Sequence, residues 1–418
     1  MKSQFKSLLT IFFLLINVVV FAQTQKCYTE GFLQSLQQTD PLAYEKMRLA
    51  RNDLLFTNAK ITDDIYMIPV VVHVVYKTEA QNISDIEIFE QINILNEDFR
   101  RLNPDSINTL PGFQDVAADC GIEFCLAQFD PEGNPTSGIV RTYTDTTEWL
   151  LPFSERVKYT DQGGDDAWPA ISYLNIWVCN LQDGILGYAY GPPTGTPDSG
   201  DGIVVDYKNF GHGDVSSKPY DLGRTATHEI GHWFGLTHIW GDDGGSCDGS
   251  DNIEDTPNQA GPTYGCPEGE VYDICSPDPP GIMYQNYLDY TDDACMNLFT
   301  EGQKNKMRSV IETKRASLLF SSAGCNEIPP LPGDIAELII YPVPTSGEFT
   351  IVIKNFLALQ ENMEINIYDA LGQLVSTANP ASANTVAQYF DLSHLATGCY
   401  FVRVFNGTYF LTDQFLLY

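Results

Sequence analysis

The sequence predicts an α+β protein: a mixed domain of sheet and helices, followed by a small all-β sandwich. A nearly continuous apolar run at residues 67–76 is typical of a strand that is buried on both faces. Apolar residues then recur at helical spacing after Ser84, which predicts an amphipathic helix that packs against this strand. Beyond residue 334, apolar residues alternate in short runs between turn residues, which is typical of a β-sandwich.

The first 22 residues have the pattern of a secretory signal peptide. Lys2 and Lys6 precede an apolar run that ends at Phe21, and Ala22 completes a small-residue cleavage pattern. The run is too short to span a bilayer, and we expect no membrane span elsewhere in the chain. Residues 23–51 are polar and are interpreted as a pro-segment. We therefore expect a secreted protein, either extracellular or attached to the cell surface.

The chain carries 55 Asp and Glu residues against 23 Lys and Arg residues, which gives a formal net charge of -32. Such a surface repels nucleic acid and anionic membranes, so we expect neither as a partner. Solubility outside the cell is the simplest reason for the charge, and carboxylates that bind calcium are the alternative.

The mixed domain is predicted to extend from residue 52 to residue 325. Its helix begins at a capping box formed by Ser84 and Glu87 and ends before Pro104. The residues of its apolar face are Ile88, Ile92, Leu95, Phe99 and Leu102. Further strands are predicted at residues 122–129, 174–181, 186–190 and 203–207. His73, within the first strand, is interpreted as a core residue rather than a ligand.

Residues 241–286 are rich in Gly, Asp, Pro and Cys and show almost no periodicity. A loop of this length in a compact domain is usually functional or stapled. Export makes the ten cysteines candidates for disulfides. Four of them lie in or beside this loop, and the sequence alone does not choose among their pairings: Cys247, Cys266, Cys275 and Cys295. A Pro-rich linker is predicted at residues 326–334, before the sandwich at residues 335–418.

The segment HEIGHWFGLTH, from His228 to His238, carries the clearest chemical signal of the chain. His228 and His232 are four residues apart, so on a helix both imidazoles project from one face and can reach one zinc ion at about 2.1 Å. Glu229 follows the first ligand, where a carboxylate can take a proton from a zinc-activated water and pass it to a leaving amine. Gly235 can adopt the left-handed conformation that brings His238 back as the third ligand. The added glycine and third histidine argue against a chance HExxH.

With this extended motif, the sequence resembles the metzincin clan and, within it, the pappalysin family of secreted metallopeptidases. The resemblance covers roughly residues 60–325 and rests also on LGRTATHEIGHWFGLTHIWGDDGGSC, on LNIWVCNL followed by LGYAY, and on NYLDYTDDACMNLFTEGQ. It implies a catalytic domain with a twisted, mostly parallel sheet plus helices, split by a cleft whose floor is the zinc helix. It also implies that residues 186–190 form an edge strand with which an extended substrate pairs.

The resemblance implies further site residues. Where the family has a Met in the turn below the metal, this chain has Leu288; the two side chains have similar volume, so we expect the hydrophobic support to be kept. Tyr290 matches a family tyrosine near the zinc, whose hydroxyl could bind the metal or donate to the developing oxyanion. A packed aromatic is the alternative. The disulfides that the family implies are Cys247–Cys275 and Cys266–Cys295.

Two more roles follow from the same resemblance. Asp251, Asp255 and Thr256 resemble a calcium-binding turn, and a solvated acidic loop is the alternative. Cys27, in the pro-segment, could bind the zinc as a thiolate and keep the precursor latent. The alternatives are a disulfide partner or an idle thiol, and an acidic residue could do the same job. Maturation is expected to cut near residues 47–51.

The tail, residues 335–418, resembles the C-terminal sorting domain of the type IX secretion pathway. The resemblance rests on YPVPTSGEFTI, INIYDALGQLV and LATGCYFVRV, and it implies that the secretion machinery recognises this domain. The chain ends in FLLY, whereas such domains usually end in basic residues. A carbohydrate- or protein-binding sandwich is the alternative.

Together, these patterns predict a monomeric, secreted, zinc-dependent endopeptidase that acts on proteins or peptides. One alternative is a secreted adhesin in which the zinc is structural. Glu229 argues against it, because a structural site needs no general base and usually has four protein ligands. A zinc hydrolase that acts on a non-peptide amide is the other alternative.

Overall fold

The computed structural model describes residues 25–39, 41, 44–45, 64–150, 153–182, 184–193, 200–212, 218–242, 245–325, 337–354, 363–370, 373–380, 385–405 and 410–418. The predicted signal peptide, the expected maturation region at residues 47–51 and the predicted linker at residues 326–334 lie outside these residues.

The mixed domain is built on a seven-stranded sheet with the order β1-β6-β7-β5-β2-β3, in which β4 also pairs with β2. Its strands are β1 (Gln25–Cys27), β2 (Tyr66–Tyr76), β3 (Ile122–Leu126), β4 (Ile139–Tyr143), β5 (Leu174–Cys179), β6 (Ile185–Ala189) and β7 (Ile203–Asp206). Each of these pairings is parallel except that of β6 with β7. The predicted mostly parallel sheet is confirmed, with β3 and β5 shorter than expected.

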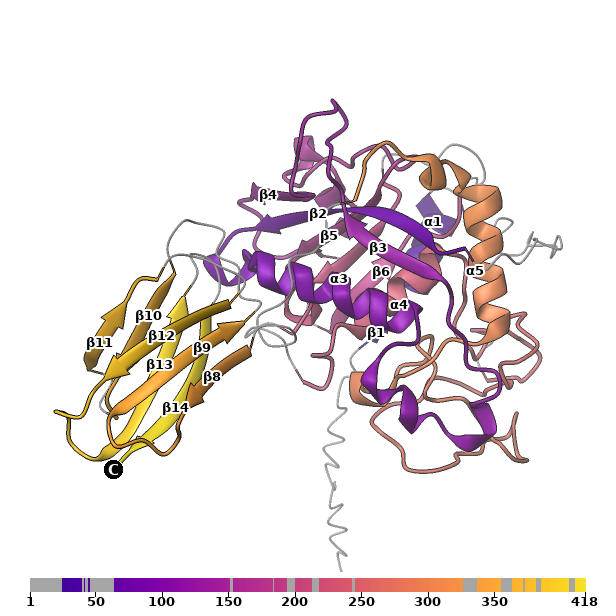
Figure 1. Cartoon of the computed structure of the whole chain (residues 1–418). Coiled ribbons are helices and arrows are strands. Elements are labelled where there is room, and N and C mark those ends of the chain that lie inside the picture. Colours follow the sequence, from indigo (N-terminus) through magenta and orange to yellow (C-terminus); the bar gives the residue numbers. More distant parts are fainter. Residues whose placement is uncertain are drawn as a thin grey trace, which may run out of the picture.

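Strand β2 is the centre of the domain because both of its faces are buried. Val70, Val72 and Val74 point into the core that the sheet forms with α3 (Asp85–Phe99) and α4 (Arg224–Trp233). Val75 points to the opposite face and packs in a second core with Trp149 and Trp177. Figure 1 shows α3 crossing the sheet, with α5 (Glu301–Lys314) at one side. The continuous apolar run of β2 therefore forms a fully covered strand, as predicted.

Helix α3 begins at the predicted capping box. The Ser84 hydroxyl accepts from the Glu87 amide at 3.3 Å, and the Glu87 carboxylate accepts from the Ser84 amide at 2.8 Å. The helix ends at Phe99, and Arg101 has a φ of 51°, which turns the chain away. The prediction that Leu102 belongs to the apolar face was wrong: its side chain lies beyond this left-handed turn and is 67% exposed.

His73 is a core residue, as predicted. Its ring is fully buried and stacks on Trp177, with ring centroids 5.1 Å apart. Nδ1 lies 2.6 Å from the Asp165 carboxylate, and Nε2 lies 3.0 Å from the Asn175 side-chain oxygen. Both ring nitrogens therefore have protein partners, and neither is available to a metal ion.

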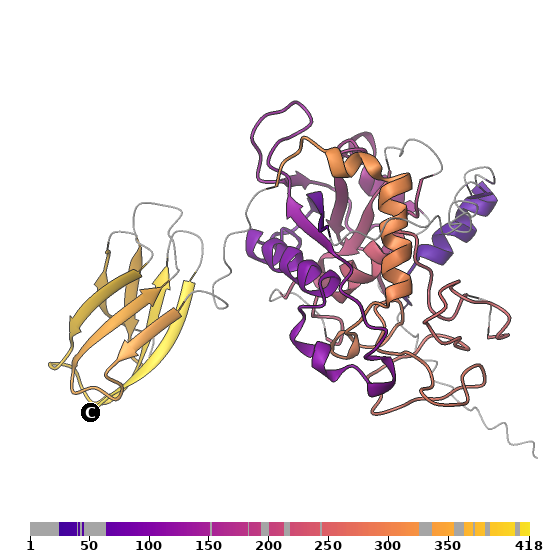
Figure 2. The ribbon, with the colours of Figure 1, turned by 45° about the vertical axis from the view of Figure 1, so that its right-hand side comes forward.

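Among the described residues, the shorter elements include one further helix and eight 3-10 turns. They are α1 (Thr29–Thr39), η1 (Glu79–Gln81), η2 (Pro104–Asn108), η3 (Pro111–Phe113), η4 (Phe153–Lys158), η5 (Thr160–Gln162), η6 (Tyr207–Asn209), η7 (Asp293–Cys295) and η8 (Ala316–Phe320). Helix α1 begins at the edge of the sheet, where Thr29 contacts β6, and projects away from the sheet in Figure 2.

Three disulfides staple the mixed domain. Two of them join the cysteines of the long loop in the pairing that the family resemblance implies, Cys247–Cys275 and Cys266–Cys295. The third, Cys125–Cys325, joins strand β3 to the residue that precedes the predicted linker. Nothing local in the sequence indicates this bond, because the two cysteines are 200 positions apart. The remaining cysteines are thiols: Cys27, Cys120, Cys179 and Cys399.

The C-terminal unit is the predicted β-sandwich. One sheet has the strand order β11-β10-β13-β14 and the other has the order β12-β9-β8. The strands are β8 (Glu337–Tyr341), β9 (Glu348–Lys354), β10 (Glu364–Tyr368), β11 (Leu374–Ala378), β12 (Thr385–Asp391), β13 (Gly398–Phe405) and β14 (Phe410–Leu417). Alternate residues of both sheets, such as Ile351, Ile365 and Val402, are buried between them, which explains the alternating pattern of the sequence.

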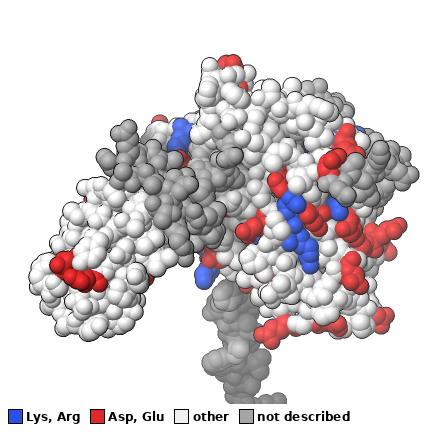
Figure 3. Space-filling view, in the orientation of Figure 1, with Lys and Arg blue, Asp and Glu red and all other residues white. Residues whose placement is uncertain are grey.

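The surface reflects the excess of acidic residues. On the face shown in Figure 3, carboxylate side chains are spread over the mixed domain, and the cationic side chains are fewer, several of them forming a short stripe. Among the helices that the structure describes, none has the length and apolar character needed to cross a membrane.

Candidate metal centre and active site

Helix α4 holds two of the three motif histidines on one buried face. After the helix ends, Gly235 has a φ of 89°, which confirms the predicted left-handed conformation and turns the chain back. His238 thereby returns to the helix: its Nε2 lies 3.2 Å from that of His232, which in turn lies 3.1 Å from that of His228. All three rings are buried.

The hydrogen bonds of the three Nδ1 atoms determine whether each Nε2 carries a proton or a lone pair. His228 Nδ1 lies 2.7 Å from the Tyr287 carbonyl oxygen, and His232 Nδ1 lies 2.9 Å from that of Leu236. His238 Nδ1 lies 2.9 Å from the Asp242 carboxylate, a partner that sequence analysis missed although it stands four residues further along the chain. Because all three partners only accept, each Nδ1 carries the proton and each Nε2 presents a lone pair.

Three lone pairs that face one another cannot form hydrogen bonds, and only a cation satisfies them together. Their mutual distances of 3.1 and 3.2 Å suit a single ion held at about 2.1 Å from each nitrogen. Burial lowers the pKa of His228 well below its ordinary value, so that ring stays neutral, as a metal ligand must be. The residues present therefore fit a zinc ion.

Glu229 lies beside this cluster and is fully buried. Its Oε2 accepts from the Thr29 hydroxyl at 3.1 Å, whereas its Oε1 has no hydrogen-bond partner among the described residues. Burial raises the pKa of Glu229 to about 8, and a neighbouring cation acts in the opposite direction by favouring the carboxylate. Gly187 packs against this side chain so closely that a methyl group there would lie 2.9 Å from Glu229 Cγ.

Residues 25–29, which belong to the predicted pro-segment, occupy the site in this structure. Strand β1 pairs in parallel with β6, so that Cys27 stands opposite Gly187. The Gly187 carbonyl accepts from the Tyr28 amide, and the Ala189 amide donates to the Thr29 hydroxyl, both at 3.0 Å. Without β1, β6 would be the outer strand of the sheet, which is the place that the family resemblance implies for it.

The Cys27 sulfur lies close to the histidine cluster, where it could serve as a fourth metal ligand. Its Sγ and one nitrogen of each of the three histidines lie within 4.8 Å of one another. The same sulfur lies 3.5 Å from Glu229 Oε2 and accepts from the Thr29 amide at 3.3 Å. Burial is the main cause that raises the pKa of the Cys27 thiol well above its ordinary value, so only a nearby cation would keep it as a thiolate.

Lys26 fills a pocket beside the cluster, and sequence analysis did not single it out. Its side chain is 1% exposed. The ammonium donates to the Thr291 carbonyl at 3.0 Å, lies 3.6 Å from the Asp293 carboxylate and faces the Tyr220 ring at 5.0 Å. Burial lowers the pKa of Lys26, and the carboxylates of Asp293 and Asp289 act against this shift. The neighbouring carboxylates and the Thr291 carbonyl thus partly offset the cost of burying this ammonium group.

Tyr290 and Leu288 lie beside the histidine cluster and below α4, respectively. The Tyr290 ring contacts the His238 ring, with centroids 5.0 Å apart, and its hydroxyl donates to the Cys27 carbonyl at 3.2 Å. Burial raises the pKa of Tyr290 well above its ordinary value, so the hydroxyl remains a donor. Leu288 is fully buried below α4, and a methyl group on Gly231 would lie 3.0 Å from it.

The acidic turn makes its hydrogen bonds within the protein. Both Asp251 oxygens accept from the Thr256 hydroxyl, at 2.9 and 2.8 Å. Asp255 accepts from the Thr300 hydroxyl at 2.7 Å and from the Gly302 amide at 2.8 Å, at the start of α5. Burial raises the pKa of Asp251 to about 7. Asp255 thus fastens the loop to the start of α5, and the bond between Asp251 and Thr256 lies within the loop.

Comparison with known families gives two matches along the chain. The peptidase family described as pregnancy-associated plasma protein-A matches residues 158–312, which include the histidine motif. The family described as secretion system C-terminal sorting domain matches residues 339–417, which form most of the β-sandwich.

Relatives and solved structures cover most of the mixed domain. An extracellular metalloprotease of Colletotrichum graminicola is 33% identical over 296 residues, which are 69% of this chain and 89% of the relative. Extracellular metalloprotease 1 of Coccidioides posadasii is 35% identical over 254 residues, 58% of this chain and 76% of the relative. A mutant of Tannerella forsythia promirolysin has a TM-score of 0.66 and 48% identity, and the match covers 71% of this chain and 97% of that one. Tannerella forsythia mature mirolysin in complex with a cleaved peptide has a TM-score of 0.60 and 53% identity, with 61% and 96% covered.

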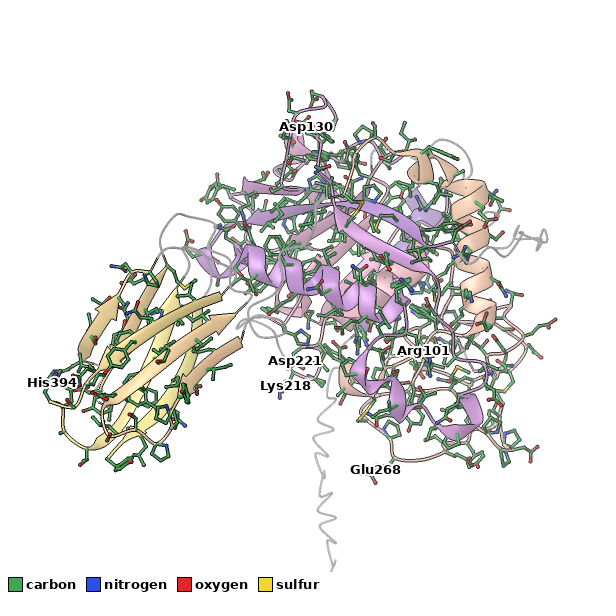
Figure 4. The ribbon with its side chains drawn as sticks, in the orientation of Figure 1. Arg101, Asp130, Lys218, Asp221, Glu268 and His394 are labelled. Carbon is green, nitrogen blue, oxygen red and sulfur yellow. A yellow bond between two sulfur atoms is a disulfide. The ribbon has the colours of Figure 1, made fainter. Side chains whose placement is uncertain are left out.

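We predict that the purified chain retains zinc and that this zinc depends on the three clustered histidines. His228→Ala, His232→Ala and His238→Ala should each lower the zinc content after dialysis, measured by plasma mass spectrometry, because each removes one lone pair. His212→Ala and His394→Ala are matched controls, since both side chains are exposed and lie outside the cluster; His394 is labelled on the β-sandwich in Figure 4. Equal zinc content in all five variants would contradict the assignment.

Proposed function

Because the chain belongs to the pappalysin family of extracellular metalloproteases, we propose that His228, His232 and His238 bind its zinc and that Glu229 is its general base. The protein is a secreted, zinc-dependent endopeptidase, and its relatives are described as extracellular metalloproteases. The observation that carries the residue roles is the convergence of three Nε2 lone pairs beside a buried carboxylate oxygen that has no hydrogen-bond partner among the described residues.

Each group of the site has a part in peptide hydrolysis. Bound zinc supplies a Lewis acid that polarises the scissile carbonyl and acidifies the attacking water. Glu229 accepts the proton of that water at Oε1, which has no hydrogen-bond partner among the described residues, and then delivers it to the leaving amine. The Tyr290 hydroxyl, which now donates to a pro-segment carbonyl, is placed to donate to the oxygen that gains negative charge. Strand β6 binds the substrate backbone through groups such as the Gly187 carbonyl.

The alternatives find less support in the site. A structural zinc in an adhesin would need no carboxylate such as Glu229, which is buried at a cost unless it is used or paired. A hydrolase of non-peptide amides would not need an extended backbone partner along its cleft, which β6 offers to β1. The curated relatives described above are metalloproteases.

We predict that Glu229→Ala loses the cleavage of a denatured protein substrate while it keeps its zinc. Removal of a general acid–base group lowers kcat by about 10²–10⁴-fold. The measurement is the initial rate of cleavage by the processed protein, followed by gel electrophoresis, with and without a chelator. Zinc content serves as the control for the metal site. Cleavage at the wild-type rate by the variant would refute the role of Glu229.

We further propose that Cys27 and Thr29 together keep the precursor latent. The Cys27 sulfur stands where it can complete the ligand set of the three histidines. The Thr29 hydroxyl holds Glu229 and also receives the Ala189 amide of β6, so the same residue blocks the base and the substrate strand. The precursor is thus inhibited at three places: the metal site, the general base Glu229 and the substrate-binding strand β6.

For latency we predict that Cys27→Ala yields a precursor that cleaves a peptide before any processing. Thr29→Val, which keeps the shape of the side chain but removes the hydroxyl, should raise precursor activity by a smaller amount. Cys179→Ala is the matched control, because it removes a buried thiol that lies outside the histidine cluster. The measurement is peptide cleavage by precursor whose intact length is verified by mass spectrometry. Wild-type latency in Cys27→Ala would exclude the thiolate role.

The pocket that holds Lys26 supports a preference for substrates with a basic residue next to the scissile bond. Burial of an ammonium group is costly unless carboxylates and carbonyl oxygens surround it, and Asp293 and the Thr291 carbonyl provide them here. After the pro-segment leaves, a substrate lysine or arginine can enter the same pocket.

We predict that kcat/KM for a peptide with lysine at this position exceeds that of its norleucine analogue by about tenfold or more, which corresponds to about 1.4 kcal/mol. Norleucine keeps the apolar stem and removes only the charge, so the pair isolates the electrostatic contribution. Because the site is buried, added salt should weaken this preference only slightly. Equal kcat/KM values for the two peptides would show that the pocket does not select charge.

The remaining proposals concern ions, assembly and export. Calcium binding by Asp251, Asp255 and Thr256 is supported by their oxygen-rich turn, although the hydrogen bonds of Asp251 to Thr256 would have to yield to the ion. A melting temperature that calcium leaves unchanged would count against it.

We propose that the protein acts as a monomer, which light scattering would test. We also propose that the secretion machinery recognises the domain at residues 335–418. The catalytic domain is proposed to span residues 52–325, with a linker at residues 326–334.

A further inference from the structure

A buried carboxylate on α3 connects the elements around the first zinc ligand. Asp98 is fully buried. Its Oδ1 accepts from the Tyr287 hydroxyl at 2.9 Å and pairs with the Arg224 guanidinium. Its Oδ2 accepts from the Thr227 hydroxyl at 2.6 Å. One side chain thus bonds to two residues of α4 and to one residue of the turn below it.

Two short routes run from this carboxylate to His228. Thr227 precedes His228 on α4, so the Thr227 bond fixes the helix directly beside the ligand. The Tyr287 carbonyl receives the His228 Nδ1 proton at 2.7 Å, so the bond from the Tyr287 hydroxyl fixes the residue that orients the ring. For His232, the corresponding acceptor is the backbone carbonyl oxygen of Leu236, which is only four residues further along the chain. Among these two ligands, only His228 takes its orientation from a distant segment.

The charge of Asp98 is what allows it to hold three partners. A carboxylate offers two acceptor oxygens, and its negative charge compensates Arg224 at the start of α4. Arg224 also pairs with a second carboxylate, that of Asp105, at 3.0 Å. Asp105 is partly exposed, and it makes no hydrogen bond to Thr227 or Tyr287 in the described structure. Asp98 and Asp105 therefore share one arginine. Of these two aspartates, Asp98 is the one that bonds to Thr227 and Tyr287, the residues that hold His228 in place.

We propose that Asp98 is a positioning residue for the zinc ligand His228, acting through Thr227 and through the Tyr287 carbonyl. This inference rests on the proposed zinc site. Groups that orient metal-bound imidazoles commonly change metal affinity or activity by about 10–100-fold when they are mutated. Asp98 would act indirectly, because it bonds to the residues that hold His228 and not to His228 itself. It would keep the Tyr287 carbonyl at a fixed position relative to helix α4.

The test measures zinc affinity and a cobalt spectrum in the full-length precursor. Tyr287→Phe removes only the hydroxyl that donates to Asp98, and Asp98→Asn leaves one acceptor oxygen where two are needed. Both variants should bind zinc more weakly, by about tenfold or more for Asp98→Asn and by less for Tyr287→Phe. Zinc is titrated against a chromophoric chelator. In protein loaded with Co²⁺, both variants should shift the visible absorption bands, which report ligand geometry at the ion.

Asp105→Asn is the matched control, since it weakens the same arginine pair without touching the supports of His228. It should lower the melting temperature but leave the zinc affinity and the cobalt spectrum as in the wild type. Wild-type affinity and spectrum in both Tyr287→Phe and Asp98→Asn would overturn the proposal, as would an equal change in Asp105→Asn. If Asp98→Asn does not fold, Tyr287→Phe decides. A wild-type chain that binds no zinc would instead refute the proposed metal site itself.

Discussion

Three imidazole lone pairs that face one another are the constraint on which the rest of this site depends. Each Nδ1 is bonded to an acceptor, so the Nε2 atoms of His228, His232 and His238 can be satisfied together only by a cation. The turn at Gly235 serves this convergence, since a continuous helix would carry His238 to another face. The buried Glu229 depends on it as well, because a positive ion favours its ionised form.

The helix that carries the ligands is held by buried ion pairs at both ends. Asp98 pairs with Arg224 at the start of α4, as described above. At the other end, Arg315 pairs with Asp201 at 3.0 Å and lies over the ring of Trp233, whose indole nitrogen donates to the same aspartate. Lys218 and Asp221, labelled in Figure 4, mark the loop that leads into this helix. Buried pairs of this kind are costly to break on one side only, so they fix the helix in one position.

The parts that local patterns encode could be predicted from the sequence. The apolar run of β2, the capping box at Ser84 and the spacing of the motif histidines each lie within one segment, and the structure has them as expected. What was missed joins distant segments: the Cys125–Cys325 bond, the contact of Thr29 with Glu229, and the bonds of Asp98. A single polar residue carries no period, so its partner becomes visible only when the chain is folded.

The Cys125–Cys325 bond has a mechanical consequence for a chain with a sorting domain at its end. Any pull that export exerts on the tail enters the mixed domain at Cys325 and passes through the sulfur atoms into β3, next to the central strand β2. Helix α5 lies on the stretch between these two cysteines and is therefore bypassed by the force.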